Sequence, residues 1–297
     1  MNNLKLLSSL SVPVLLLTSC SLFNSNNVDE PTARNRLNNI KANQDSETFT
    51  FPRTVSVTKK INAYVENTSF GNTEINKENL SLLLALDLNN FYFQYSLTNL
   101  LMPTLSVSEY FYVEDGVFYM IKETAGAKIY NTINDLTGKE VEDILLLEAA
   151  KRDLYGYVLG EGELFESYRM LDYYQNGEDA YRDSLQIGSQ VKQFEYEFYS
   201  NNENQIELKE TLENTLDYSS GLNHGTDDNY SYRDYVFQTN ILKSATVNII
   251  TNLEYYYQDT VISLYNTKEN AEINVYLSVD LEKVDLTNFV YDETFTY

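Results

Sequence analysis

The chain has 297 residues, 43% of them hydrophobic, and a formal net charge of −23. Its apolar content argues against a fully disordered protein, and its length allows one large domain or two small ones. The negative charge repels phosphate backbones and anionic headgroups, so we expect no nucleic-acid partner and, unless local basic patches exist, no peripheral membrane face.

The chain begins with a short polar segment that carries Lys5, and an apolar stretch follows from Leu6 to Leu17. That stretch is too short for a transmembrane helix, which needs about 20 apolar residues. A charged start, a short apolar core and small residues at its end are typical of a secretory signal peptide. We therefore expect residues 1–19 to be a signal peptide.

The apolar stretch ends in Leu17-Thr18-Ser19-Cys20, which contains the only cysteine of the chain. An aliphatic residue, two small residues and a cysteine resemble the lipobox of bacterial lipoproteins. The resemblance implies cleavage before Cys20, lipidation of Cys20 and attachment to the extracytoplasmic face of the cell membrane. Two acyl chains would make this anchor stable. The alternatives are an ordinary signal peptide and a small buried cysteine.

The residues after Cys20 are mainly polar, and from residue 54 apolar and polar residues alternate. Residues 20–30 are expected to form a lipidated, flexible tether, and residues 31–44 a short helix with Pro31 in its first turn. From residue 54 apolar and polar side chains alternate, which predicts a strand with one wet face. The apolar face of that strand would carry Val55, Val57, Ile61, Ala63 and Val65.

Two hairpins are predicted next, over residues 80–99 with a turn at Asn89-Asn90 and over residues 106–123 with a turn at Asp115-Gly116. A capping box at residues 137–140 then starts a helical insertion over about residues 137–176. Gly156, Gly160 and Gly162 are expected to break its first helix.

Strands return after about residue 190. A hairpin is predicted over 191–213, and strands over 244–258, 260–266 and 271–284. Residues 215–233 are mostly polar and are expected to form a long loop, and loops of this length are usually functional or mobile.

This order of elements predicts an α+β fold, mainly antiparallel β, with a curved half-barrel sheet packed against the central helical segment. Residues 31–297 would form a single extracytoplasmic domain, with two small domains divided near 136–190 as the alternative. The element order and the hairpin "YFYVEDGVFYMIKE" resemble the LolA/LppX-like group of lipoproteins and lipoprotein carriers. That resemblance implies an apolar cavity between sheet and helices.

Residues with catalytic or metal-binding chemistry are few. The only histidine, His224, cannot form a zinc site of several histidines, and no nucleophile elbow accompanies Ser219, Ser220 or Asp227 nearby. Glu195 and Glu197 are more readily read as a solubilising strand face than as an acid–base pair.

An acidic run over residues 225–234 contains the oxygen ligands that Ca²⁺ prefers, namely Asp227, Asp228, Asn229 and Asp234. Their order does not match an EF-hand loop. We therefore expect no catalytic residues, no metal, no cofactor and no enzyme activity.

The predicted function is non-catalytic binding by a membrane-anchored surface lipoprotein, with an apolar or lipid ligand. The alternative is an interaction or adhesion module for protein or glycan partners, which would use tyrosine-rich strands at 194–199 and 254–258 or the segment 215–233. A roomy apolar cavity would favour the first function, and a filled core with a flat tyrosine patch would favour the second.

Overall fold

The computed structural model describes residues 26–27, 30–69, 72–160, 190–202, 205–220 and 222–297. In this part of the chain the strands form one 13-stranded sheet in the order β1-β8-β9-β10-β11-β12-β2-β3-β4-β5-β6-β7-β13. The predicted signal peptide, Cys20 and the second half of the predicted helical insertion lie outside the described residues.

The sheet consists of two groups of consecutive strands. The first group is β2 (Thr54–Ser69), β3 (Asn72–Asp87), β4 (Tyr92–Asn99), β5 (Val107–Glu114), β6 (Val117–Thr124) and β7 (Lys128–Ile133). The second is β8 (Gln190–Asn202), β9 (Gln205–Ser220), β10 (Asn223–Gln238), β11 (Ile241–Tyr257) and β12 (Thr260–Tyr276). Short strands at the edges are β1 (Asn26–Asn27) and β13 (Val290–Tyr291). Neighbouring strands run antiparallel, except that β13 pairs with β7 in parallel.

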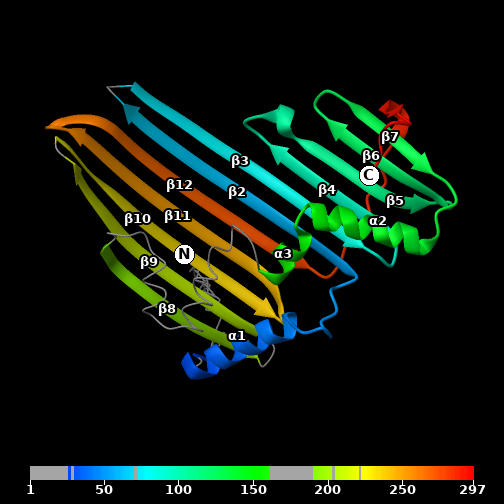
Figure 1. Ribbon diagram of the computed structural model, residues 1–297, viewed down its shortest axis with the longest axis horizontal. Coiled ribbons are helices and arrows are strands. Elements are labelled where there is room, and N and C mark those ends of the chain that lie inside the picture. The colour runs from blue at the N-terminus through cyan, green and yellow to red at the C-terminus, as the bar shows by residue number, and fades with distance from the viewer. Residues whose placement is uncertain (1–25, 28–29, 70–71, 161–189, 203–204, 221) are drawn as a thin grey trace, which may run out of the picture.

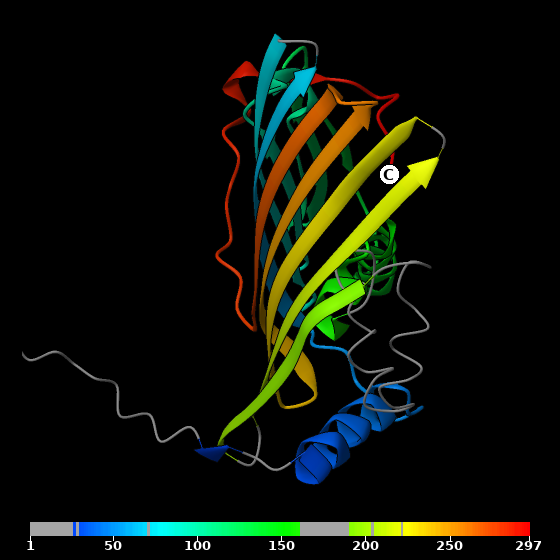
Figure 2. The ribbon, with the colours of Figure 1, turned by 90° about the vertical axis from the view of Figure 1, so that its left-hand side faces the viewer.

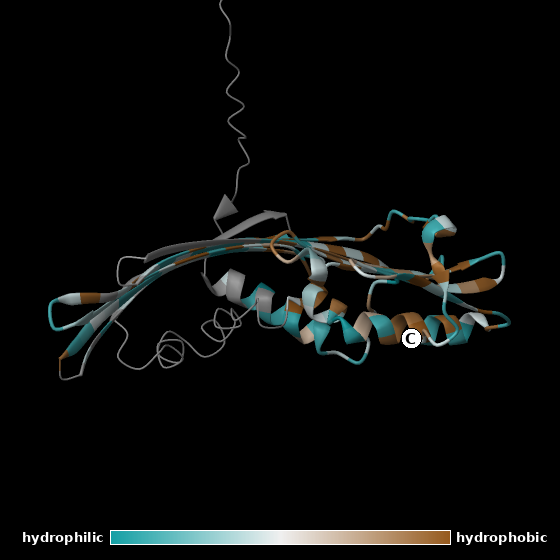
Figure 3. Cartoon of the chain, turned by 90° about the horizontal axis from the view of Figure 1, so that it is seen from above, coloured by the Kyte–Doolittle hydropathy of each residue, from teal (hydrophilic) through white to brown (hydrophobic). Residues whose placement is uncertain are grey.

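The sheet is curved and open, and its two faces are covered differently. Three helices lie on the concave side: α1 (Glu30–Gln44), α2 (Gly138–Lys151) and α3 (Leu154–Leu159) (Figures 1 and 3). The segment that follows β12 lies on the opposite, convex side (Figure 2). The predicted α+β class with a curved, mainly antiparallel sheet is therefore confirmed. Among the described residues, no helix is both long and apolar enough to cross a bilayer.

The main core lies between the concave side of the sheet and helices α2 and α3. The alternation predicted for β2 and β3 supplies it, because successive side chains of a strand point to opposite faces. Its largest fully buried side chains are Phe93, Phe118, Leu84, Leu86, Met120, Leu145 and Leu154. The described interior under α2 and α3 is therefore packed with side chains.

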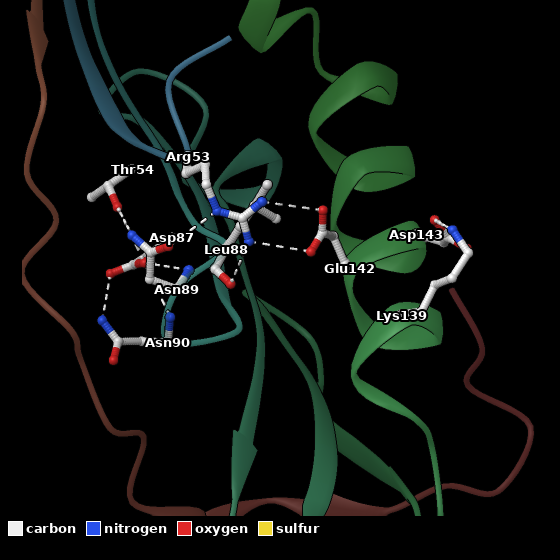
Figure 4. Close-up of polar contacts among 9 residues, drawn as sticks. All are labelled: Arg53, Thr54, Asp87, Leu88, Asn89, Asn90, Lys139, Glu142 and Asp143. Carbon is white, nitrogen blue, oxygen red and sulfur yellow. Dashed lines mark hydrogen bonds and ion pairs between the residues drawn. The ribbon is translucent and has the colours of Figure 1, made fainter. Parts of the chain in front are cut away.

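Helix α2 begins with the predicted capping box. The amide of Glu140 donates to Thr137 Oγ1 (3.3 Å), and the amide of Thr137 donates to Glu140 Oε2 (2.8 Å). Figure 4 shows that Arg53, just before β2, pairs with Glu142 of α2 (3.2 Å) and donates to Asn89 Oδ1 (3.1 Å). One guanidinium thus joins the start of β2, the β3–β4 turn and α2.

Both predicted hairpins in the first half of the chain are present. Asp115 and Gly116 form the β5–β6 turn with positive φ angles of 50° and 80°. In the β3–β4 turn the positive φ angle belongs to Phe91 (52°) and not to Asn89 or Asn90. Instead, the backbone N–H groups of Asn89 and Asn90 donate to Asp87 Oδ1 (2.9 and 3.1 Å), and these hydrogen bonds stabilise the turn.

The break between the two described helices lies earlier than predicted. Asp153 adopts a left-handed conformation (φ 52°) and ends α2, whereas Gly156 lies inside α3. A Cβ atom at Gly156 would lie 2.5 Å from Asp153 Oδ2, so a larger residue there would require the exposed Asp153 side chain to move. Gly160 does end α3, with a φ angle of 76°.

The prediction of a loop over residues 215–233 was wrong. These residues form most of the hairpin between β9 and β10, with β11 on the other side of β10. The outer parts of these strands extend beyond the described helices (Figure 1). Cross-strand hydrogen bonds therefore hold them in the sheet, and no strict apolar alternation is needed.

The predicted strand over residues 271–284 is only half correct. Strand β12 ends at Tyr276, which pairs with Ser56 near the start of β2, so no partner strand remains for the residues that follow. Leu277 and Leu281 are accordingly exposed, by 62% and 51%. Residues 277–297, here called the C-terminal strap, cross the convex face and form a second apolar cluster there. That cluster joins Val279, Val284, Leu286 and Phe289 of the strap to Ala85, Tyr92, Tyr110, Tyr112 and Ile121 of the sheet.

Candidate functional site

The outer ends of β2, β11 and β12 extend past α2 and α3 (Figure 1). Their concave side carries half-buried apolar side chains. These side chains continue the alternation that places Val57 and Ile273 in the core. Cross-strand pairs such as Leu253 with Tyr265 bring them together. We call this surface the concave outer face; its residues are Ile61, Ala63, Val65, Ile249, Leu253 and Tyr265.

Lys59 lies between the main core and the concave outer face. It has the same orientation as Val57 and Ile61, and its Nζ atom lies 5.8 Å from the ring centroid of Tyr157 in α3. Within the described residues its ammonium group makes no ion pair or hydrogen bond. Burial lowers the pKa of Lys59, and the negative charge of Glu269 opposes this shift only in part. The site therefore places one poorly solvated cation at the end of a strip that is mainly apolar. The strip also contains Thr267 and Glu269, which are the cross-strand neighbours of Val65 and Ala63.

A second group of charges lies at the end of α2. Arg152 pairs with Glu148 (2.6 Å) and with Glu109 of β5, and Lys122 pairs with Glu109 (2.8 Å). Burial alone would raise the pKa of Glu109, but the hydrogen bond from Lys122 and the charge of Arg152 outweigh it, so the pKa is lowered. Because each carboxylate of this network is paired with a cation, we interpret the network as structural: it holds the end of α2 against β5.

The convex face of the outer strands is polar and contains tyrosines paired with acids. Tyr64 donates to Glu66 (3.1 Å) and Tyr256 to Glu254 (3.0 Å), in each case two residues apart on one strand. Asp234 lies on the same face, and burial together with the charge of Glu207 raises its pKa to about 6.

Replacing Asp234 with asparagine is expected to stabilise the protein above pH 6 by about 1 kcal/mol, after allowing for solvent screening of a half-buried group. Because the pKa of the Asp234 carboxyl rises on folding, the folded state is most stable when this carboxyl is protonated. Wild-type stability should therefore fall as the pH rises from about 4 to about 6 and then stay level. Urea unfolding across this range measures the effect. Equal pH profiles for the two proteins would contradict it.

The other residues considered from the sequence are distributed over both faces of the outer strands. His224 lies on the convex face of β10 and stacks on Tyr256, with ring centroids 5.1 Å apart. Asp227 points to the opposite face from His224 and Asp228, because strand residues alternate. Ser219 is the cross-strand neighbour of His224.

Asp234, the remaining acid of the run over residues 225–234, lies further along β10 than Asp227 and Asp228. Within the described ranges no three His, Cys, Asp or Glu side chains are placed to hold a metal ion. The side chains of Glu195, Glu197 and Ser220 lie outside the described residues.

Comparisons with known proteins add little to this description. No protein-family model matches the sequence, and no curated protein does. Among solved structures, the ywiB protein from Bacillus subtilis matches with 10% identity and a TM-score of 0.15, covering 74% of this chain and 92% of its own.

Two further solved structures match as weakly. Lipovitellin matches with 12% identity and a TM-score of 0.24, and the match covers 79% of this chain but only 26% of lipovitellin. A bacterial polysaccharide outer membrane secretin matches with 6% identity and a TM-score of 0.24, covering 76% and 99% of the two chains. At these scores none of them assigns a family or function, so the LolA/LppX-like resemblance stays a prediction.

Proposed function

We propose that the protein is a lipid-anchored, non-catalytic binding protein of the extracytoplasmic membrane face, and that its concave outer face binds an apolar chain with an anionic head. Lipidation at Cys20 rests on the lipobox-like sequence Leu17-Thr18-Ser19-Cys20. The binding function rests on a separate feature, the position of Lys59.

The observation that carries the ligand class is the half-buried ammonium of Lys59, which lacks an ion pair within the described residues. A half-buried ammonium that makes no ion pair or hydrogen bond within the described residues is poorly solvated, and the charge of Glu269 compensates for this only in part. The carboxylate of a ligand would therefore be stabilised there. The adjoining aliphatic side chains would take the apolar tail, because their burial removes apolar surface from water. A neutral lipid would contact the aliphatic side chains but would leave the ammonium group of Lys59 without an anionic partner.

Among the described residues, the main core beneath α2 and α3 is filled with buried side chains. We therefore place the ligand on the concave outer face. A protein or glycan partner remains the alternative use of the surface. The hydrogen bonds between tyrosines and carboxylates on the convex face support this alternative.

Two adjacent lysines provide the test. Lys59 lies on the concave face, and Lys60 is exposed on the convex face. We expect Lys59→Met to weaken binding of a fluorescent fatty acid by about tenfold, since a charged hydrogen bond contributes about 1.5–3 kcal/mol. Binding of the matching methyl ester should not change, and Lys60→Met should affect neither ligand.

The measurement is a fluorescence titration of residues 26–297, preceded by mass spectrometry of an organic extract of the natively purified protein. Affinity for the acid should also fall as the pH rises toward the lowered pKa of Lys59, where the ammonium loses its proton. Equal acid binding by the two lysine variants would refute the role of Lys59. Failure of the wild-type protein to bind either acid or ester would refute the lipid ligand altogether.

A further inference from the structure

A cavity of about 270 Å³ lies between the convex face of the sheet and the C-terminal strap. It is on the opposite side of the sheet from Lys59. Leu83 and Ala85 of β3 form its apolar part. Tyr276 at the end of β12 and the strap residues after it form the opposite wall. The remaining lining residues are Ser56, Thr58, Gln94, Ser278, Val279 and Asp280.

Hydrogen bonds between sheet and strap fix the walls of this cavity. The hydroxyl of Ser56 donates to the carbonyl of Ser278 (2.7 Å). The side-chain amide of Gln94, only 4% exposed, donates to the carboxylate of Glu282 (3.3 Å). These two hydrogen bonds fix the position of the strap relative to the sheet on either side of the cavity.

Other polar groups of the lining are not used by the protein. The side-chain hydroxyls of Thr58 and Tyr276 and the carboxylate of Asp280 make no hydrogen bond within the described residues. They stand beside the apolar surface of Leu83 and Ala85. This combination, an apolar wall with a few convergent polar groups, is typical of small-molecule sites.

We propose that the cavity binds a single uncharged sugar residue. The carbon–hydrogen face of a pyranose ring would pack on Leu83 and Ala85, and its hydroxyls would meet Thr58 and Asp280. An anionic ligand is disfavoured, because Asp280 lines the cavity and Glu282 lies beside it. The volume lies just below the range of about 300–1,000 Å³ for drug-sized ligands, so a larger molecule would not be enclosed.

The test uses the full chain, solubilised in a detergent without a sugar headgroup, and saturation-transfer NMR with glucose, galactose and N-acetylglucosamine. We expect transfer to the ring protons of at least one sugar. Thr58→Tyr fills the cavity and should abolish the transfer. Asn62→Tyr introduces the same side chain on the same face of β2, outside the cavity, and should preserve it.

A second variant keeps the test decisive if Thr58→Tyr fails to fold. Asp280 is exposed on the strap, so Asp280→Asn should fold normally while weakening sugar binding by about tenfold through loss of a charged acceptor. The proposal is overturned if the wild-type protein gives no transfer to any of the three sugars, or if transfer persists unchanged in all variants. Transfer to ethanolamine alone would overturn it in favour of a cationic ligand.

Discussion

Replacement of Arg152 with methionine is expected to lower the free energy of unfolding by about 3 kcal/mol. The guanidinium neutralises Glu148 and Glu109, which are only 2% and 6% exposed, and it also lies 4.9 Å from the ring centroid of Tyr95. Methionine keeps much of the apolar volume but leaves two buried carboxylates with one lysine each. Lys151 remains 2.7 Å from Glu148, which sets the loss at the lower end of the range for broken buried pairs.

The pH dependence separates a charge effect from lost packing. The pKa of Glu109 is lowered in the folded protein, so its contribution is present above its ordinary value of 4.5 and is lost as the pH falls through the folded pKa. The difference between wild type and Arg152→Met should therefore shrink below about pH 4.5. Lys139→Met, which removes an exposed pair with Asp143 (Figure 4), should cost less than about 1 kcal/mol. An Arg152→Met loss that is independent of pH would contradict the electrostatic explanation.

Truncation of Leu145 to alanine should destabilise the protein by about 2–5 kcal/mol, because the side chain is completely buried beneath the sheet and its removal leaves a cavity. Leu147 lies two residues further along α2 and is 48% exposed, so Leu147→Ala should change stability by no more than about 0.5 kcal/mol. Chemical denaturation with a common slope measures both variants. Similar losses for the two leucines would mean that α2 packs on the sheet through a different face.

Local patterns in the sequence predicted the elements that pack against the main core. In β2 and β3 one face meets helices and the other does not, so apolar and polar residues alternate and the strands are readily recognised. The capping box at Thr137 and Glu140 marks the start of α2 in the same way. The turn residues Asp115 and Gly116 identify the β5–β6 hairpin.

The prediction failed where neighbouring strands, and not the local pattern, determine the structure. The polar hairpin of β9 and β10 is held between other strands, although its sequence resembles a loop. Beyond Tyr276 the alternation continues but the partner strand ends, so the chain leaves the sheet. Neither outcome can be read from a window of a few residues.

The candidate site was hidden for a related reason. Lys59 is a charged residue at an apolar position of the β2 alternation, and that mismatch was the only local signal of its place on the concave face. The relation of Lys59 to Tyr157 depends on how α3 packs on the sheet. The strap cavity likewise requires residues from β2, β3 and the C-terminal segment to come together.

The pairing of β12 with β2 has a consequence for the order of folding. Strands β2 to β7 follow one another along the chain, as do β8 to β12, so each group can pair locally. The centre of the sheet, however, joins Ser56 to Tyr276, and closing so long a loop carries an entropic cost that slows folding. The two groups of strands can pair with each other only after β12 has been synthesised. Until then the free edge of β2 is unpaired and is open to association with other chains, so rapid completion of the C-terminal strands should limit aggregation.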